Sequence, residues 1–323
     1  MKLSVLIPFY NEEEQVKITL DTVRPIIKSI TEDYEIIAID DGSKDKTWEI
    51  IEAEGKSDSG IYGIRFSRNF GKESAICAGL ESASGDAVVL MDGDLQHPPH
   101  YIPEMVRLWQ NEGYHVIEGV KTSRGKEGKL NRFFAKAFYK GFNKISGVDL
   151  DNASDFKLLD RTVVDAWNEL NEHNTFFRSL SAWLGFKRYE LPFEVADRQH
   201  GETKWSIKSL WRLAVNAITS FSTAPLVLVT YMGILFLIIA SVIAVITLVK
   251  FFTHNALEGF TTVILLILIT GGAIMLSLGL IGTYIGKIYD EVKGRPRFIK
   301  MEEINSPDSN LEAQVNSAQK LNK

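Results

Sequence analysis

The chain has 323 residues, a formal net charge of -5 at pH 7 and a sequence pI near 5.8. This charge argues against a nucleic-acid-binding protein, because binding the phosphate backbone requires a basic surface. The single cysteine, Cys77, excludes a disulfide framework and a cysteine-based zinc site. The length allows one domain of ordinary size and an appendage.

Strands and helices are predicted to alternate along the first half of the sequence. Short runs rich in β-branched residues predict the strands, and the segments between them have helical spacing. Predicted strands cover residues 3–8, 34–40, 61–66, 86–91 and 114–118, and predicted helices begin at Asn11 and Lys46 and cover residues 72–84 and 130–145. This order predicts a mostly parallel α/β sheet that binds ligands at its carboxyl edge.

Oxygen-rich side chains follow two of these strands. Asp40 ends the second strand, where it can accept hydrogen bonds from a base or ribose, although a plain Asx turn is the alternative. Asp92, Asp94 and Gln96 follow the fourth strand at i, i+2 and i+4, so their oxygens can converge on one point. Such ligands suit Mg²⁺ or Mn²⁺ shared with substrate phosphates, and a solvated acidic turn is the alternative.

The second half of the sequence contains two uncharged apolar segments, residues 226–248 and 260–285. Each is long enough to cross a bilayer, which predicts a transmembrane hairpin; a buried helix pair is the alternative. Basic residues flank the outer ends of the hairpin, so both termini and the large domain are expected in the cytoplasm. Before the first span, residues 205–221 have apolar side chains at helical spacing, which predicts an interfacial helix or, alternatively, a core helix.

Three motifs together resemble the family 2 glycosyltransferases of the GT-A fold: residues 4–12, 40–43 and 92–99. The third, with the sequence DGDLQHPP, is typical of the polyprenyl-phosphate branch, which includes dolichol-phosphate mannose synthases and bactoprenol glucosyltransferases. Residues 152–161 and the two apolar segments are most similar to the bactoprenol glucosyltransferases. The resemblance extends over residues 4–297.

The resemblance implies a nucleotide-sugar site, a metal site and a mobile loop. The implied nucleotide-sugar site comprises Pro8, Tyr10, Glu12, Asp40, Asp92 and Lys204, and the implied metal ligands are Asp92, Asp94 and Gln96. Arg198 and Lys204 match a loop that closes on the donor, where cations would offset the charge of the leaving diphosphate. Attraction to the membrane surface is the alternative role for these two residues.

The implied acceptor is a lipid phosphate, which requires a basic pocket. Ser123, Arg124 and Arg132 are the predicted phosphate ligands, because the planar fork of arginine bonds two phosphate oxygens; a solvated basic loop is the alternative. Asp155, at the start of a predicted strand, is expected to orient the acceptor or the sugar. Proton abstraction is less important there, because a phosphate monoester is already anionic at pH 7. The predicted catalytic residues are Asp94, Asp155 and Arg198.

The predicted organisation is a cytoplasmic GT-A catalytic domain over residues 1–204, an interfacial helix over 205–223, two transmembrane helices over 224–286, and a basic segment with a polar tail over 287–323. The predicted function is that of an inner-membrane, metal-dependent, inverting transferase that moves glucose from UDP-glucose to undecaprenyl phosphate or a similar lipid. GDP-mannose or a UDP-aminopentose is the alternative donor, and a non-catalytic scaffold or flippase subunit, or a processive polysaccharide synthase, is the alternative class. Glycines in the second apolar segment would permit a homodimer or homotetramer.

Overall fold

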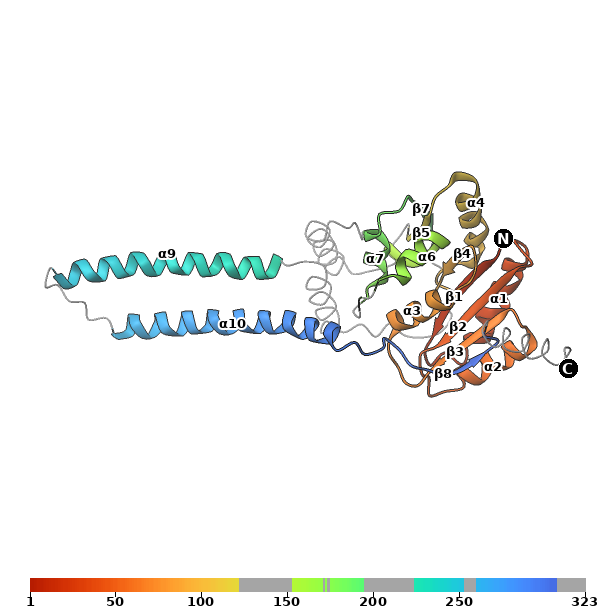
Figure 1. The fold of residues 1–323 in the computed structure, drawn as a ribbon, viewed down its shortest axis with the longest axis horizontal. Helices are drawn as coiled ribbons and strands as arrows, with labels where there is room; N and C mark the ends of the chain where they lie inside the picture. Colours follow the sequence, from red (N-terminus) through yellow and green to blue (C-terminus); the bar gives the residue numbers. More distant parts are fainter. Residues whose placement is uncertain (122–152, 171, 173–174, 195–223, 253–259, 307–323) are drawn as a thin grey trace, which may run out of the picture. The chain divides into compact units, whose positions relative to one another are not determined.

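A computed structural model describes residues 1–121, 153–170, 172, 175–194, 224–252 and 260–306 (Figure 1). The chain divides into two compact units. The first unit comprises Met1–Asn143, Val148–Lys204 and Pro296–Lys323, and the second comprises Lys144–Gly147 and Trp205–Arg295.

The first unit is built on a sheet whose described strands have the order β7-β5-β6-β4-β1-β2-β3-β8 (Figure 1). The strands are β1 (Leu3–Phe9), β2 (Tyr34–Asp40), β3 (Ile61–Phe66), β4 (Ala87–Leu90), β5 (Val116–Lys121), β6 (Ala153–Asp160), β7 (Arg188–Phe193) and β8 (Lys300–Ile304). Strands β3, β2, β1 and β4 pair in parallel, whereas β6 and β8 run antiparallel to β4 and β3. The sheet is therefore mixed and mostly parallel, in a GT-A-like α/β fold.

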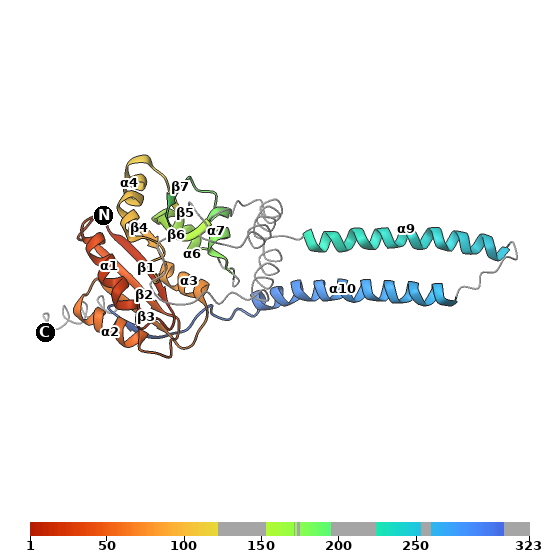
Figure 2. The ribbon, with the colours of Figure 1, turned by 180° about the vertical axis from the view of Figure 1, so that it is seen from behind.

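Helices cover both faces of this sheet (Figures 1 and 2). They are α1 (Val16–Lys28), α2 (Thr47–Ser57), α3 (Lys72–Ser82), η1 (Pro99–Tyr101), α4 (Ile102–Glu112), α6 (Arg161–Asn168) and α7 (Phe177–Trp183). Alternate residues of β1, such as Leu3 and Val5, share one core cluster with Val16 and Leu20 of α1.

On the other face of β1, helix α3 packs directly on the strand. A Cβ added at Gly79 of α3 would lie only 1.9 Å from the Leu6 Cδ1 atom. Glycine at this position therefore lets α3 approach the sheet closely. This packing fixes the start of α3, which carries Lys72, relative to the ends of the central strands.

The register of the parallel strands brings their carboxyl ends to one edge. Phe9 of β1 lies opposite Asp40 of β2, and Leu6 of β1 lies opposite Leu90 of β4. The residues that follow β1, β2 and β4 therefore meet at the same edge, as the alternating pattern of the sequence predicted.

Helix α1 begins at Val16 instead of Asn11 as predicted from the sequence. Asn11 has a left-handed φ of 51°, and its backbone N–H donates to the Ser43 hydroxyl. The backbone N–H of Glu12 donates to the Thr47 hydroxyl. This acidic segment is thus held by side chains of the loop after β2 and by the start of α2, and helical geometry begins only afterwards.

Strand β8 was not expected from the sequence. Residues 300–304 follow the apolar segments in the chain, yet they pair antiparallel with β3 at the edge of the sheet. The indole N–H of Trp48 donates to Glu302 over 3.1 Å, and Arg65 forms an ion pair with the same carboxylate at 2.8 Å. The polar tail predicted after residue 297 therefore contains a strand, and its residues from 307 onward lie outside the described residues.

The second unit contains α9 (Ala224–Phe252) and α10 (Phe260–Val292), which contact each other. Within the part of the chain that the structure describes, one segment is long and apolar enough to cross a membrane, Ile269–Val292 of α10. Residues 226–248, the other predicted span, are not shown to be long and apolar enough. The interfacial helix predicted over residues 205–223 lies outside the described residues.

Candidate active site

A cavity of about 320 Å³ lies at the carboxyl edge of β1, β2 and β4. It is lined by Pro8, Phe9, Tyr10, Glu12, Asp41, Asn69, Gly71, Lys72, Ala75, Asp92, Gly93 and Asp94. Residues from the ends of β1, β2 and β4 and from the start of α3 therefore share one site. Five of the residues predicted from the sequence motifs are among them: Pro8, Tyr10, Glu12, Asp92 and Asp94.

The loop after β2 contributes Asp41 to the cavity, whereas Asp40 is not among the lining residues. Asp40 is completely buried and accepts a hydrogen bond from the Ser43 backbone N–H at 2.9 Å. Asp41 accepts hydrogen bonds from the backbone N–H groups of Phe70 and Gly71 at 2.7 and 2.9 Å. Burial raises the pKa of both carboxyls, against the lowering effect of these backbone donors. Asp41, a buried carboxyl that lines the cavity, is a residue that the sequence prediction did not assign to the site.

Gly42 allows the turn between these carboxylates and the rest of the loop. Its φ is +66°, and a Cβ added there would lie 2.3 Å from the Arg68 carbonyl carbon. A side chain at this position would meet backbone, which cannot move aside easily. The loop after β2 is thus pressed against the loop after β3.

The turn after β4 presents Asp92 and Asp94 to the cavity. Leu95 has a left-handed φ of 57°, and the Gln96 backbone N–H donates to Asp94 Oδ1 at 3.1 Å. The Asp92 backbone N–H donates to His97 Nδ1 at 3.1 Å. His97 is buried and stacks on Phe156 of β6, with 5.4 Å between ring centroids, so it connects the turn to the core. Gln96, predicted as a metal ligand, is not among the residues that line the cavity.

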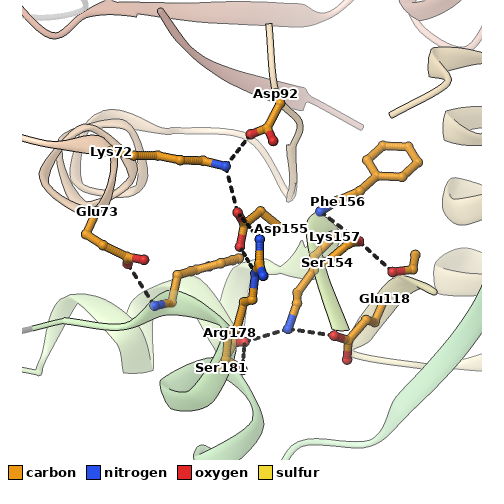
Figure 3. Close-up of polar contacts among 12 residues, drawn as sticks. Lys72, Glu73, Asp92, Glu118, Ser154, Asp155, Phe156, Lys157, Arg178 and Ser181 are labelled. Atoms are coloured by element: carbon orange, nitrogen blue, oxygen red, sulfur yellow. Dashed lines mark hydrogen bonds and ion pairs between the residues drawn. The ribbon is translucent and has the colours of Figure 1, made fainter. Parts of the chain in front are cut away.

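Lys72 connects the turn after β4 with strand β6 (Figure 3). Its ammonium Nζ lies 2.5 Å from Asp92 Oδ1 and 2.6 Å from Asp155 Oδ2. Arg178 of α7 binds Asp155 with two hydrogen bonds, from Nε to Oδ1 at 2.7 Å and from a terminal nitrogen to Oδ2 at 2.9 Å. Asp155, Lys72 and Arg178 thus form a network of charge-assisted hydrogen bonds beside the cavity.

These cations determine the protonation of Asp155, which is 5% exposed. Burial alone would raise the pKa of this carboxyl, but Lys72 and Arg178 outweigh burial and hold it well below its usual range. Burial acts to lower the pKa of Lys72, but the charges of Asp92 and Asp155 outweigh burial and raise it. Asp155 is therefore a stably ionised carboxylate at every physiological pH.

Glu73, next to Lys72 in α3, has the opposite character. Burial raises the pKa of its carboxyl to about 7, although its Oε2 accepts a hydrogen bond from the Phe177 backbone N–H at 2.8 Å (Figure 3). The charge of Asp155 acts in the same direction as burial. Glu73 thus titrates near neutrality while Asp155 does not.

A second buried pair lies two residues further along β6. Lys157, 1% exposed, forms an ion pair with Glu118 of β5 at 3.1 Å and donates to the Ser181 hydroxyl at 2.8 Å (Figure 3). Burial lowers the pKa of this lysine, and Glu118 opposes that shift. Asp155 and Lys157 are two residues apart and lie on the same face of β6. The pair of Lys157 and Glu118 is therefore next to the network of Asp155 on that face.

Two residues of this network, Lys72 and Arg178, were missed in the sequence. For Lys72 a signal exists, since the start of a helix that follows a parallel strand is placed at the ligand-binding edge. Arg178 has no local signal. Five residues with predicted roles lie outside the described part of the chain: Ser123, Arg124, Arg132, Arg198 and Lys204.

The oxygen donors of the cavity fit a divalent cation whose coordination is completed by substrate. The carboxylates of Asp92 and Asp94 both line it, and hard oxygen donors of this kind suit Mg²⁺ or Mn²⁺. Among the described residues, no group of three or more His, Cys, Asp and Glu side chains is arranged to hold a metal ion. Phosphate oxygens or waters would therefore have to supply the remaining ligands.

The chain is similar in sequence to known glycosyltransferases. The sequence profile described as Glycosyl transferase family 2 matches residues 4–167, which include every strand end that lines the cavity. A bactoprenol glucosyl transferase of Shigella phage SfII is 38% identical over 301 residues, which cover 93% of this chain and 97% of the relative. The chain belongs to glycosyltransferase family 2.

Other relatives of the glycosyltransferase match it over nearly the same length. A prophage bactoprenol glucosyl transferase homolog of Escherichia coli (strain K12) is 40% identical over 304 residues, covering 93% of this chain and 98% of the relative. The uncharacterized glycosyltransferase YkcC of Bacillus subtilis (strain 168) is 38% identical over 301 residues, covering 93% of each chain. A crystal structure of glucosyl-3-phosphoglycerate synthase from Mycobacterium tuberculosis, in complex with Mn²⁺, UDP and phosphoglyceric acid, is similar with a TM-score of 0.49 at 21% identity, covering 68% of this chain and 76% of that chain.

Proposed function

We propose that this glycosyltransferase moves glucose from UDP-glucose, with inversion, to the phosphate of a polyprenyl phosphate such as undecaprenyl phosphate. Support comes from full-length relatives that are named bactoprenol glucosyl transferases. The observation that carries the proposal is the charged network around Asp155.

The network makes Asp155 a poor general base. An acceptor hydroxyl has to lose its proton during glycosyl transfer, which requires a base with a matched pKa. Asp155 is held ionised by Lys72 and Arg178, so its affinity for a proton is low. A phosphate monoester has a second pKa near 6 and is already anionic at pH 7. The site therefore suits a phosphate acceptor better than a hydroxyl acceptor.

The proposed reaction is a single displacement. A phosphate oxygen of the lipid attacks the anomeric carbon while the bond from that carbon to the β-phosphate of UDP breaks, so the configuration inverts and no proton moves. Asp92 and Asp94 would hold Mg²⁺ or Mn²⁺, which when bound offsets the charge that develops on the departing diphosphate. Pro8, Tyr10 and Glu12 would form the wall of the donor site.

The remaining roles rest on the family motifs. Asp40, which is buried and accepts a hydrogen bond from Ser43, would position the loop that holds the nucleoside. The other assigned residues are Gln96 as a further metal ligand, Arg198 and Lys204 as cations that close on the donor, and Ser123, Arg124 and Arg132 as ligands of the acceptor phosphate.

We propose that α9 and α10 anchor the enzyme in the inner membrane as two spans, with the catalytic domain of residues 1–204 and both termini in the cytoplasm. Support comes from the span Ile269–Val292 in α10 and from the uncharged residues 226–248 within α9. An interfacial helix over residues 205–223 would bring the site to the lipid headgroups. Glycines of α10 would allow the hairpin to assemble as a dimer or tetramer.

The test uses the full-length protein purified in detergent. Radiolabelled UDP-glucose and Mn²⁺ are offered with undecaprenyl phosphate or, as the control acceptor, with undecaprenol. We expect a β-linked glucolipid from the phosphate and at least about 100-fold less from the alcohol, because Asp155, held ionised by Lys72 and Arg178, is a poor base for a hydroxyl. Equal transfer to the alcohol, or an α-linked product, would overturn the proposal.

The donor is tested in the same assay. GDP-mannose and a UDP-aminopentose replace UDP-glucose at equal concentration, and the rate of product formation is compared. Faster transfer from either alternative would reassign the sugar but leave the acceptor chemistry intact. Absence of transfer from all three donors would favour a non-catalytic scaffold.

A further inference from the structure

Lys72 pairs with one of the carboxylates that would hold a divalent cation. Its ammonium lies 2.5 Å from Asp92 Oδ1, one of the oxygens assigned above to the metal. A Mg²⁺ ion binds carboxylate oxygen at about 2.1 Å, so ion and ammonium would compete for Asp92 Oδ1. We infer that Lys72 is an internal counter-cation that holds the metal position at Asp92 and releases it when the donor brings the ion. This inference rests on the proposed function.

The charge of the site supports this exchange. In the structure the two carboxylates of Asp92 and Asp155 face two cations, Lys72 and Arg178. The cavity also holds the carboxylates of Glu12, Asp41 and Asp94, which attract a further cation. A divalent ion at Asp92 would place two further positive charges next to the ammonium of Lys72. The donor diphosphate carries the negative charge that makes room for both cations. Metal and donor are therefore expected to bind together.

The side chain of Lys72 can change partners more easily than that of Arg178. Its side chain is 40% exposed and lines the cavity, at the first turn of α3 after Gly71. A lysine ammonium on a flexible four-carbon stem exchanges partners more easily than the planar fork of an arginine. Arg178 holds Asp155 through two parallel bonds, so Asp155 stays in place when Lys72 turns away from Asp92.

Release from Asp92 leaves Lys72 with a new role. Its bond to Asp155 can remain, and its other two ammonium protons are then free to face the cavity that would hold the diphosphate. Lys72 would thus pass from the carboxylate to the leaving group. In the empty enzyme the same lysine keeps Asp92 from binding metal without donor.

The test measures Mn²⁺ binding to the full-length protein by electron paramagnetic resonance of the free ion, with and without UDP. Lys72→Met removes the charge and keeps the stem, and we expect it to bind Mn²⁺ about ten-fold more tightly without UDP. With UDP present the difference from the natural protein should shrink to about two-fold, since the diphosphate then neutralises the ammonium. Lys72→Arg, which keeps the charge, should bind Mn²⁺ without UDP as weakly as the natural protein.

Lys56→Met is the matched control. This lysine is ion-paired with Glu52 at 2.6 Å on the exposed face of α2, away from the cavity. Its loss should leave Mn²⁺ affinity unchanged. The added substitution Asp92→Asn in Lys72→Met should abolish the gain, which separates this site from other acidic groups on the surface.

Unchanged or weaker Mn²⁺ binding by Lys72→Met, with thermal unfolding like that of the natural protein, would overturn the inference. Should Lys72→Met fail to fold, Lys72→Gln carries the same expectation and the same contrary outcome. The measurement needs no lipid acceptor. A failure of glucolipid formation in the natural protein would therefore count against the proposed function and leave the Mn²⁺ result interpretable.

Discussion

The loop after β2 and the strand β6 each bury an aspartate, and they stabilise it by different means. Asp41, in the loop, accepts hydrogen bonds from neighbouring backbone N–H groups, and burial still raises its pKa. Asp155, on β6, faces two cationic side chains, and its pKa falls well below the usual range. Burial alone therefore does not decide the charge of a carboxyl in this site. At Asp155 two hydrogen-bonded cations outweigh burial, whereas at Asp41 the backbone donors do not.

The largest expected effect comes from breaking the network on β6. Asp155→Asn leaves Lys72 and Arg178 without their shared counter-charge, and we expect glucolipid formation to fall at least about 100-fold. Breaking a partly buried ion network should also lower the free energy of unfolding by about 3 kcal/mol. Radiolabelled transfer and chemical unfolding measure the two effects.

Asp165→Asn is the control for this change. Asp165 is an exposed partner of Arg161 at 3.5 Å on α6, and its loss should change stability by less than about 0.5 kcal/mol. If Asp155→Asn behaved like Asp165→Asn in both assays, the network on β6 would not matter for function or stability.

A glycine substitution tests the loop after β2. Gly42→Ala adds a Cβ that meets the Arg68 backbone at a φ of +66°, so we expect a loss of about 2–3 kcal/mol and weaker UDP binding. Gly113→Ala provides the match, because Gly113 has a φ of +63° with nothing within 4 Å of the added Cβ. There the loss should be about 1 kcal/mol. Equal losses at both positions would mean that the close approach to Arg68 is unimportant. Thermal unfolding and UDP titration measure these differences.

Glu73 differs from Asp155 because burial outweighs the effect of Lys72 and Arg178 on the pKa of its carboxyl. Its pKa, raised by burial to about 7 in the folded protein, exceeds the value of 4.5 that it has when unfolded. The folded state therefore holds the proton more tightly, and the stability from this group is complete below pH 4.5 and is lost as pH rises through 7. The expected loss is on the order of 3 kcal/mol, at about 1.4 kcal/mol for each pKa unit.

Glu73→Gln should remove this part of the pH dependence. Glutamine keeps an acceptor for the Phe177 backbone N–H but does not ionise. Unfolding free energies measured between pH 4.5 and 8 should be flatter in the variant than in the natural protein. An identical slope in both proteins would show that Glu73 is not the titrating group.

The smallest effect is expected at the exposed edge of the sheet. Glu302→Ala removes the ion pair with Arg65 and the hydrogen bond from Trp48, but the carboxylate is 42% exposed. We expect a loss of no more than about 1 kcal/mol in unfolding free energy and no change in transfer rate. A much larger loss would mean that β8, and not only its side chains, detaches from β3.

Much of the donor side of the site follows from local patterns. β-branched runs predicted β1 to β4 within a few residues, and the parallel order placed Asp92 and Asp94 at the carboxyl edge. The same reasoning placed Asp40 in the site, where the structure instead has it buried and Asp41 lining the cavity. A one-residue step at a strand end reverses which side chain faces the ligand, and sequence patterns do not resolve that step.

By itself the sequence determined the alternation of strands and helices, the edge at which the motifs meet, and the family, because strand period and strand-end chemistry are local properties. Only the tertiary structure decided that Lys72 lies between Asp92 and Asp155, that Arg178 holds Asp155, and that the chain returns as β8 beside β3. Lys72 and Asp155 are 83 residues apart in the chain. Contacts at such separation depend on how α3 and α7 pack on the sheet, and no local pattern of residues encodes that packing.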